Sequence, residues 1–232
     1  MFPTFVEQTK LLKKYHYPSR LFINKNIPVT GRSISFYRTH LFPKFKSTSK
    51  LLIYFRNKNI LDIGSGINHL YRNSFIYKVK TKNKIAMDLY DVNKEYNLPD
   101  KLNIFKKGNI YNTKLKSNYF DLITINNVLY FWIDSPKLLL KAFKELYRIL
   151  KINGQIRIFP VFFGNYSYNN KKLHTYINNH FCIKLIEPIK YGTESFKYVK
   201  NNKIISGSKM SGINEKKINI LLKSYILILN KI

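Results

Sequence analysis

A short aliphatic segment that runs into two closely spaced glycines constrains this sequence most. Residues 60–63 carry three aliphatic side chains around a single acid, and Gly64, Ser65 and Gly66 follow directly. A short apolar run that ends in a glycine turn predicts a buried strand of a parallel sheet. Because glycine has no Cβ, such a turn lets a ligand approach the backbone closely. The segment therefore predicts a binding loop at one edge of a sheet.

Strands and helices are expected to alternate from this point to the end of the chain. The expected strands cover residues 59–63, 84–88, 103–107, 120–125, 155–159, 182–186 and 224–229. The expected helices cover residues 68–80, about 136–151 and 171–180. Such alternation predicts an α/β fold in which helices cover both faces of a parallel sheet.

The second of these helices has clear signals at both ends. Ser135 is expected to cap it and Pro136 to occupy its first position, and Gly154 is expected to stop it. One apolar stripe runs along it at helical spacing, formed by Leu139, Phe143, Leu146 and Leu150. This stripe predicts the side of the helix that packs on the core.

Residues 1–50 differ from the rest of the sequence. They contain several prolines, little periodicity, and aromatic residues scattered among Lys and Arg. We expect a short helix near residues 6–15 and then an irregular segment that folds over the rest, either as a flexible arm or as a lid. The sequence thus predicts an N-terminal extension over residues 1–50 and one domain over residues 51–232.

Two acids stand beside the predicted glycine turn. The expected strand 84–88 ends in Asp88, about twenty residues after the turn, where a carboxylate can accept hydrogen bonds from both hydroxyls of a ribose. Asp88 is therefore a predicted ribose ligand. Asp62 lies inside the first strand, where it either holds the loop through hydrogen bonds or contacts the ligand, and the sequence leaves both roles open.

Several motifs in this order resemble those of class I S-adenosylmethionine (SAM)-dependent methyltransferases. They are Asp62-x-Gly64-x-Gly66, the acid Asp88, Gly108-Asn109-Ile110, Phe120-Asp121-Leu122-Ile123 and Leu150-Lys151-x-Asn153-Gly154. Together they span roughly residues 59–160. The resemblance implies a Rossmann-like, doubly wound sheet of about seven strands, mostly parallel, with an antiparallel last strand.

The resemblance also implies SAM as the cofactor and a set of residues that bind it. These are Asp62, Gly64, Ser65, Gly66, Asn68, Asp88, Asn109, Ile110 and Asn126. Asn68 replaces the third glycine of the family's loop; we expect it to tolerate left-handed backbone and its amide to contact the methionine moiety. Asn109 replaces the usual acid at the adenine, where a neutral acceptor binds more weakly.

The methyl acceptor and any general base are not assigned by a motif. Asn126 and Asn127 follow the fourth strand, where they either meet the substrate or cap a turn. The aromatic run 130–132 either stacks on a substrate or belongs to the core. If the acceptor is a hydroxyl or a protonated amine, the candidate bases are His40, His69, Tyr130 and Asp134, although a structural role is favoured for His69.

The charge of the chain is strongly positive. Forty-one Lys and Arg residues face twelve Asp and Glu residues, which gives a formal net charge of +29. Such a surface attracts nucleic acid and other polyanions. The alternative is the composition of a genome poor in G and C, because most of these residues are Lys and Arg is not enriched.

The remaining sequence features concern location. A single cysteine, Cys182, permits no intramolecular disulfide, so a reducing compartment is expected. The first residues lack the pattern of a secretory signal, and no apolar run reaches the roughly 18 residues of a membrane span. We expect a cytoplasmic protein without a metal, although the basic start leaves an organelle transit peptide open.

Three functions follow as hypotheses. The first is a SAM-dependent methyltransferase that acts on a small molecule or a protein. The second is an RNA-directed methyltransferase that uses the basic surface. The third is a catalytically silent binding protein with the same fold, which the changes at Asn68 and Asn109 leave open.

Overall fold

The structure is a computed structural model of the whole chain. It describes residues 31–81, 83–91, 93–94, 97, 100, 102–126, 128, 135–162, 170–186, 196–200, 203–207 and 224–232, together with two short strands at 23–24 and 27–28. The helix predicted near residues 6–15 lies outside these ranges.

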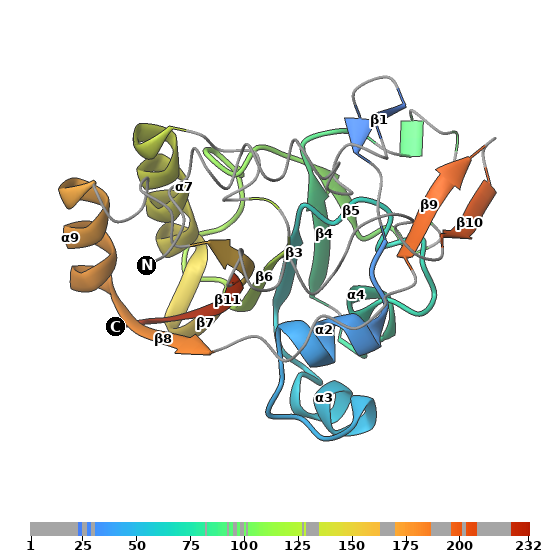
Figure 1. Cartoon of the computed structure of the whole chain (residues 1–232), viewed down its shortest axis with the longest axis horizontal. Coiled ribbons are helices and arrows are strands. Elements are labelled where there is room, and N and C mark those ends of the chain that lie inside the picture. The colour runs from blue at the N-terminus through green and yellow to red at the C-terminus, as the bar shows by residue number, and fades with distance from the viewer. Residues whose placement is uncertain are drawn as a thin grey trace.

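A seven-stranded sheet forms the centre of the molecule (Figure 1). Its strands, from one edge to the other, are β5 (Phe105–Lys107), β4 (Lys84–Asp88), β3 (Ile60–Ile63), β6 (Phe120–Asn126), β7 (Leu150–Phe162), β11 (Ser224–Lys231) and β8 (Phe181–Ile186). Strands β5 to β7 are parallel neighbours, and β11 runs antiparallel to both β7 and β8. The predicted fold class, including the antiparallel last strand, is confirmed.

Helices cover both faces of the sheet (Figure 1). One face carries α7 (Pro136–Ile149) and α9 (Lys171–His180), and the other carries α2 (Ile34–His40), α3 (Thr48–Tyr54) and α4 (Phe75–Lys78). The alternation along β11 shows the two cores. Leu227 and Leu229 belong to the core under α7 and α9, whereas Ile226 and Ile228 belong to the core under α2 and α3.

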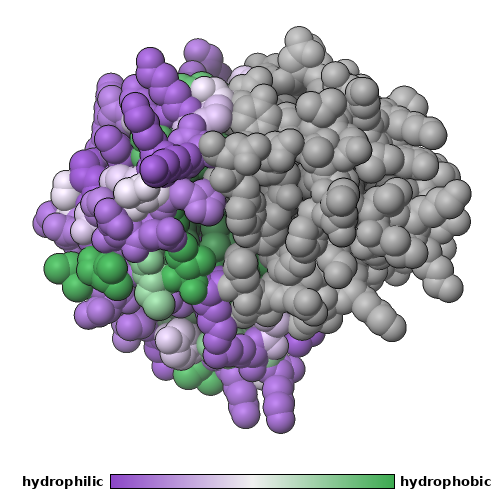
Figure 2. Space-filling view, turned by 60° about the vertical axis from the view of Figure 1, so that its left-hand side comes forward, coloured by the Kyte–Doolittle hydropathy of each residue, from purple (hydrophilic) through white to green (hydrophobic). Residues whose placement is uncertain are grey.

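The outer surfaces of α7 and α9 are polar. Figure 2 brings this side forward and shows mainly hydrophilic residues in the described part, with small hydrophobic areas between them. The stripe predicted on α7 points the other way, because Leu139, Phe143, Leu146 and Leu150 are all completely or almost completely buried. None of the helices in the described ranges has the length and apolar character that a membrane crossing requires.

Two small hairpins accompany the sheet and were not predicted. One pairs β1 (Ile23–Asn24) with β2 (Ile27–Pro28), and the other pairs β9 (Phe196–Lys200) with β10 (Lys203–Gly207).

The prediction of a helix over residues 68–80 is mostly wrong. Turns occupy residues 67–73, and only α4, of four residues, is helical. Ser74 explains this, because its hydroxyl donates to the backbone oxygen of Asn68 at 2.5 Å and accepts from the N–H of Tyr77 at 3.1 Å. Ser74 therefore closes the turn and caps a new helix at once.

The predicted ends of the helix after Pro136 also need correction. Ser135 makes no capping hydrogen bond with its side chain, and α7 ends at Ile149, before Gly154. Leu150 is already extended and pairs with Phe120, so β7 begins there. The last carbonyls of a helix have no partner within the helix. Here the ammonium of Lys231 donates to the carbonyls of Tyr147 and Leu150, both at 2.8 Å.

Residues 31–50 are more regular than predicted. They contain α2 and the first turn of α3. Ser33 caps the start of α2 and Ser47 caps the start of α3. Tyr37, Leu41 and Phe42 are almost completely buried in the core under these helices. The boundary expected after residue 50 falls inside α3, and the division into two domains stays a prediction.

Candidate functional site

The carboxyl ends of three neighbouring parallel strands meet at one edge of the sheet. The glycine turn follows β3, Asp88 ends β4, and Asn126 ends β6. This edge is where open α/β sheets bind their ligands. The fold therefore brings together residues that the sequence places far apart, as predicted.

The backbone N–H groups of the turn are bonded within the protein. Those of Gly64 and Ser65 donate to the carbonyl oxygen of Met87 at 2.9 and 3.1 Å, and that of Gly66 donates to Asp88 Oδ2 at 2.9 Å. These three N–H groups therefore hold the turn against the end of β4. Asp88 thus joins the end of β4 to the turn, and its Oδ1 accepts from the N–H of Tyr90 at 3.3 Å. Because a carboxylate has about four acceptor positions, capacity remains for a ligand hydroxyl.

Gly64 is required by packing inside the protein. Its φ is +67°, and a Cβ built there would lie 1.9 Å from Cγ2 of Val128. The neighbouring Gly66 has a φ of +50°. The turn thus uses both the left-handed freedom of glycine and, at Gly64, its lack of a side chain.

Asp62 holds the loop from below. Its side chain is fully buried and accepts hydrogen bonds from Tyr37 and Thr124, both at 2.7 Å, and from Asn68 at 2.9 Å. Burial raises its pKa to about 6, against the effect of these bonds, and the charge of Asp88 adds to the rise. Of the two roles left open for Asp62, these contacts support loop holding.

Asn68 belongs to the same buried network. Its Oδ1 accepts from the backbone N–H of Arg32 at 2.7 Å, and its Nδ2 donates to Asp62 and to the Tyr37 hydroxyl at 2.8 Å. The amide is therefore engaged inside the protein, and its expected contact with a ligand stays a prediction. The expected left-handed backbone is absent, because Asn68 is not among the described residues with positive φ.

The sequence did not point to three partners in this network, namely Arg32, Tyr37 and Thr124. The contact of Thr124 with Asp62 could have been predicted, because aligning the expected strands 59–63 and 120–125 places the two residues side by side, as the structure does. No local signal marked Arg32 or Tyr37, which lie in a segment expected to be irregular.

Two buried polar atoms beside the turn have no hydrogen-bond partner. They are Oγ of Ser65, which is 1% exposed, and Oδ1 of Asn126, which is 8% exposed. The backbone oxygen of Asn126 lies 3.7 Å from the Cβ position of Gly64, so the two residues are neighbours. Because an unpaired buried polar atom costs free energy, both atoms favour a ligand that bonds to them.

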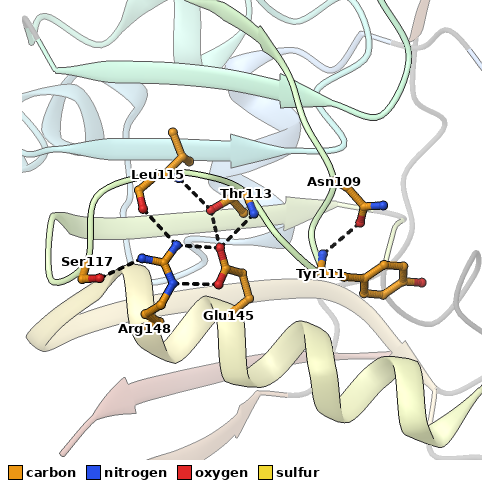
Figure 3. Close-up of polar contacts among 7 residues, drawn as sticks. All are labelled: Asn109, Tyr111, Thr113, Leu115, Ser117, Glu145 and Arg148. Carbon is orange, nitrogen blue, oxygen red and sulfur yellow. Dashed lines mark hydrogen bonds and ion pairs between the residues drawn. The ribbon is translucent and has the colours of Figure 1, made fainter.

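Asn109 and Ile110 follow β5. The Asn109 side chain accepts from the N–H of Tyr111 at 2.9 Å, which makes it part of a turn (Figure 3). Ile110 is buried in the core. Neither observation tests their predicted contact with adenine, which stays a prediction.

Hydrogen bonds fasten the same loop to an ion pair on α7, formed by Glu145 and Arg148 (Figure 3). Glu145 Oε1 accepts from the N–H and the hydroxyl of Thr113 at 2.8 and 2.6 Å, and it also lies 2.7 Å from Arg148. Arg148 in turn donates to the carbonyl of Leu115 and the hydroxyl of Ser117. The hydrogen bonds from Arg148 lower the pKa of Glu145 to about 2, so the pair stays charged.

The two candidate histidine bases are buried and neutral. Burial lowers the pKa of His40 to about 4, and the ring stacks on Phe36 at 4.4 Å. Burial also lowers the pKa of His69, whose Nε2 lies 2.7 Å from Asn93 Oδ1 and whose ring stacks on Phe105. These contacts support structural roles.

The other candidates for catalysis cannot be placed. Asn127, the aromatic run 130–132 and Asp134 lie outside the described residues.

Known proteins resemble the chain at the level of domain family and structure. Residues 61–158 match the family model described as a methyltransferase domain. No curated protein matches the sequence. Similar solved structures include the N-methyltransferase NodS from Bradyrhizobium japonicum WM9 in complex with S-adenosyl-L-homocysteine, with 9% identity, a TM-score of 0.47, and coverage of 96% of this chain and 97% of that chain.

Two further structures are similar to a comparable degree. A putative S-adenosylmethionine-dependent methyltransferase from Listeria monocytogenes has 15% identity and a TM-score of 0.48, over 79% of this chain and 96% of that one. The tRNA (m1A58) methyltransferase TrmI from Aquifex aeolicus has 11% identity and a TM-score of 0.44, over 79% and 67%. Residues 61–158 are therefore similar to a methyltransferase domain, and the strand order of the sheet is that of a Rossmann-like fold.

Proposed function

We propose that the protein is a SAM-dependent methyltransferase whose acceptor is a small molecule or a protein. One observation carries the proposal: the carboxyl ends of β3, β4 and β6 gather the glycine turn, Asp88 and two buried, unpaired polar atoms on Ser65 and Asn126. SAM, when bound, supplies a methyl group that its sulfonium already activates.

The residues at this edge fit the chemistry of SAM. Asp88 offers a carboxylate for the ribose hydroxyls, and burial raises its pKa, so bonds from hydroxyls would favour its charged form. Ser65 Oγ both donates and accepts, and Asn126 Oδ1 accepts. These two atoms suit the carboxylate and the ammonium of an amino acid. Asp62 and Asn68 act one layer below, where they fix the turn.

The test is binding of SAM and of S-adenosylhomocysteine by calorimetry, in the unchanged protein and in Asp88→Asn. Asparagine keeps an acceptor for the N–H of Gly66, removes the charge, and gives up only the long, exposed 3.3 Å bond from the N–H of Tyr90. Thermal unfolding of the variant checks that the fold is retained. Each charge-assisted hydrogen bond is worth about 1.5–3 kcal/mol, so the affinity should fall roughly tenfold or more. Asp91→Asn is the matched control, because Asp91 lies three residues on and bonds only to its own turn.

Thermal stability gives a second measurement. A ligand at a hundredfold excess over its dissociation constant stabilises the folded state by about 2.7 kcal/mol. Equal affinity in Asp88→Asn and the unchanged protein would remove the ribose assignment. Absence of any binding or stabilisation by either compound would overturn the proposal and favour the silent binding protein.

A further inference from the structure

A row of paired residues crosses the sheet from the glycine turn to the far edge. The register pairs Asp62 with Thr124, Thr124 with Arg157, Arg157 with Ile228, and Ile228 with Lys184. Directly paired residues point to the same face of a sheet. All of them therefore point to the face covered by α2 and α3, where Ile228 is part of the core.

Arg157 brings an unpaired positive charge to this row. It is 8% exposed, and its guanidinium lies 4.5 Å over the ring of Phe42. Its hydrogen bonds go to the backbone oxygen of Leu41 and to the amide oxygen of Gln155, which are both neutral. Burial lowers its pKa to about 10, so Arg157 stays charged at neutral pH, and no carboxylate of the described residues pairs with it.

Two exposed lysines join Arg157. Lys44 follows Phe42 by two residues in the connection between α2 and α3, and Lys184 lies in β8, the edge strand. The charge of Lys184 lowers the pKa of Lys44, and Arg157 acts in the same direction. The geometry agrees, because Lys44 stands two residues after the ring under Arg157, and the register places Lys184 two strands from Arg157 on the same face. A bound anion would offset the repulsion among these cations.

The acids that the structure describes are engaged elsewhere. Asp121 pairs with Lys151, and Glu145 pairs with Arg148. Asp62 and Asp88 support the glycine turn, and Asp91 and Asp100 accept from backbone N–H groups close to them in the chain. No ion pair within the described ranges joins a carboxylate to Lys44, Arg157 or Lys184.

An exposed aromatic ring completes the cluster. Tyr54, the last residue of α3, is 60% exposed, and its ring packs on Phe45 and Phe55 with centroids 5.2 and 4.7 Å away. Phe45 in turn lies 6.3 Å from Phe42, the ring under Arg157, so the Tyr54 ring stands at the side of the cluster. Cations that hold phosphates beside a ring that stacks on a base are the two elements of sites for single-stranded nucleic acid.

We propose that Lys44, Arg157 and Lys184 bind a phosphodiester of a single-stranded nucleic acid, and that Tyr54 stacks on one of its bases. Lys184 and Asp62 are separated by four strand spacings, or about 19 Å, so this site is distinct from the glycine turn. The proposal goes beyond methyl transfer and does not depend on SAM binding.

The first test compares two double variants of equal charge. Lys44→Ala/Lys184→Ala removes the cluster, and Lys137→Ala/Lys141→Ala removes two exposed lysines from α7 on the opposite face. Binding of a fluorescent oligouridine RNA is followed by anisotropy over a range of salt concentrations. We expect the cluster variant to bind about tenfold more weakly at low salt, and the slope of log K against log salt to fall by about 0.7 for each lost phosphate contact.

The α7 double variant distinguishes binding at one site from attraction to the overall positive charge of the protein. Equal weakening in both double variants would overturn the proposal, because it would make RNA binding a property of the net charge. Unchanged binding in the cluster variant would overturn it as well. Thermal unfolding of each variant, together with its SAM affinity, confirms that the folded protein is being compared.

Variants of Tyr54 give a second, independent test of the proposal. We expect Tyr54→Phe to bind oligouridine as the unchanged protein does and Tyr54→Ala to lose about fivefold or more, because stacking is worth about 1–3 kcal/mol per base. Equal binding by both would remove the stacking role.

Vesicles that contain phosphatidylserine test the alternative that the cluster binds an anionic membrane surface. If the cluster variant loses binding to vesicles and keeps its binding to RNA, the site belongs to a membrane surface and the proposal is wrong.

Discussion

The hydroxyl of Tyr37 donates a 2.7 Å hydrogen bond to the buried carboxylate of Asp62, 25 residues further along the chain. Burial raises the pKa of Tyr37 well above its usual value, so the hydroxyl keeps its proton and remains a donor. Through this bond α2 supports the strand that leads into the glycine turn. The segment before residue 51 is thus part of what holds the candidate site.

Tyr37→Phe should weaken both the fold and the site. The change leaves Asp62 with one donor fewer and removes an acceptor from Asn68, and each buried group left unpaired costs about 1–3 kcal/mol. Urea unfolding measures the loss of stability, and calorimetry with SAM measures the effect on the turn. Tyr90→Phe is the control, since Tyr90 is partly exposed. Similar effects of both changes would contradict the support role.

Asp62 should make stability depend on pH in an unusual direction. Its pKa is about 6 in the folded protein and 3.8 for the free side chain, so the folded state holds the extra proton between these values. Raising the pH from about 4 to about 6 should therefore lower the free energy of unfolding by roughly 2 kcal/mol through this group. Chemical unfolding at several pH values measures the slope.

Asp62→Asn is the variant that isolates this effect. It should be less stable at low pH because Asn68 loses an acceptor, but it should lack the additional decline between about pH 4 and about pH 6. The same pH dependence in the variant and in the unchanged protein would show that another group causes it.

Gly64→Ala should disrupt the turn for two separable reasons. The new Cβ would clash with Val128, and alanine does not readily adopt a φ of +67°. Overpacking costs about 1–3 kcal/mol and left-handed backbone about 1–2 kcal/mol. Combining Gly64→Ala with Val128→Ala removes the clash only, so urea unfolding should show a partial recovery. Full recovery would mean that the backbone conformation is not constrained.

Glu145→Gln should loosen the loop that carries Asn109. The folded pKa of Glu145 is depressed, so its ion pair contributes stability above the unfolded value of 4.5 and loses it as the pH falls toward about 2. Replacing the carboxylate should cost about 1–2 kcal/mol at pH 7, because hydrogen bonds to a charged group are strong. Acid unfolding of Glu145→Gln, compared with Lys141→Gln as a control on the same helix, measures the effect. Identical acid transitions in the two variants would contradict this role.

Local sequence patterns determined most of the sheet and one helix. The bounds of β4 and α9 agree with the expected ranges, and β3 and β6 differ from them by one residue. These elements depend on signals that act over a few residues, namely apolar runs, caps and turns. The position of the candidate site follows from the same signals, because parallel strands place their carboxyl ends at one edge.

Only the tertiary structure decided which groups satisfy one another. The hydrogen bonds of Tyr37 and Thr124 to Asp62, the bond of Lys231 to the end of α7, and the meeting of Lys44 with Lys184 all join residues far apart in the chain. A buried polar group needs a hydrogen-bond partner, and the fold decides which residue lies near enough to be that partner. No local sequence pattern encodes this residue. Asn68 shows the consequence, since its amide bonds to Arg32, Tyr37 and Asp62 inside the protein.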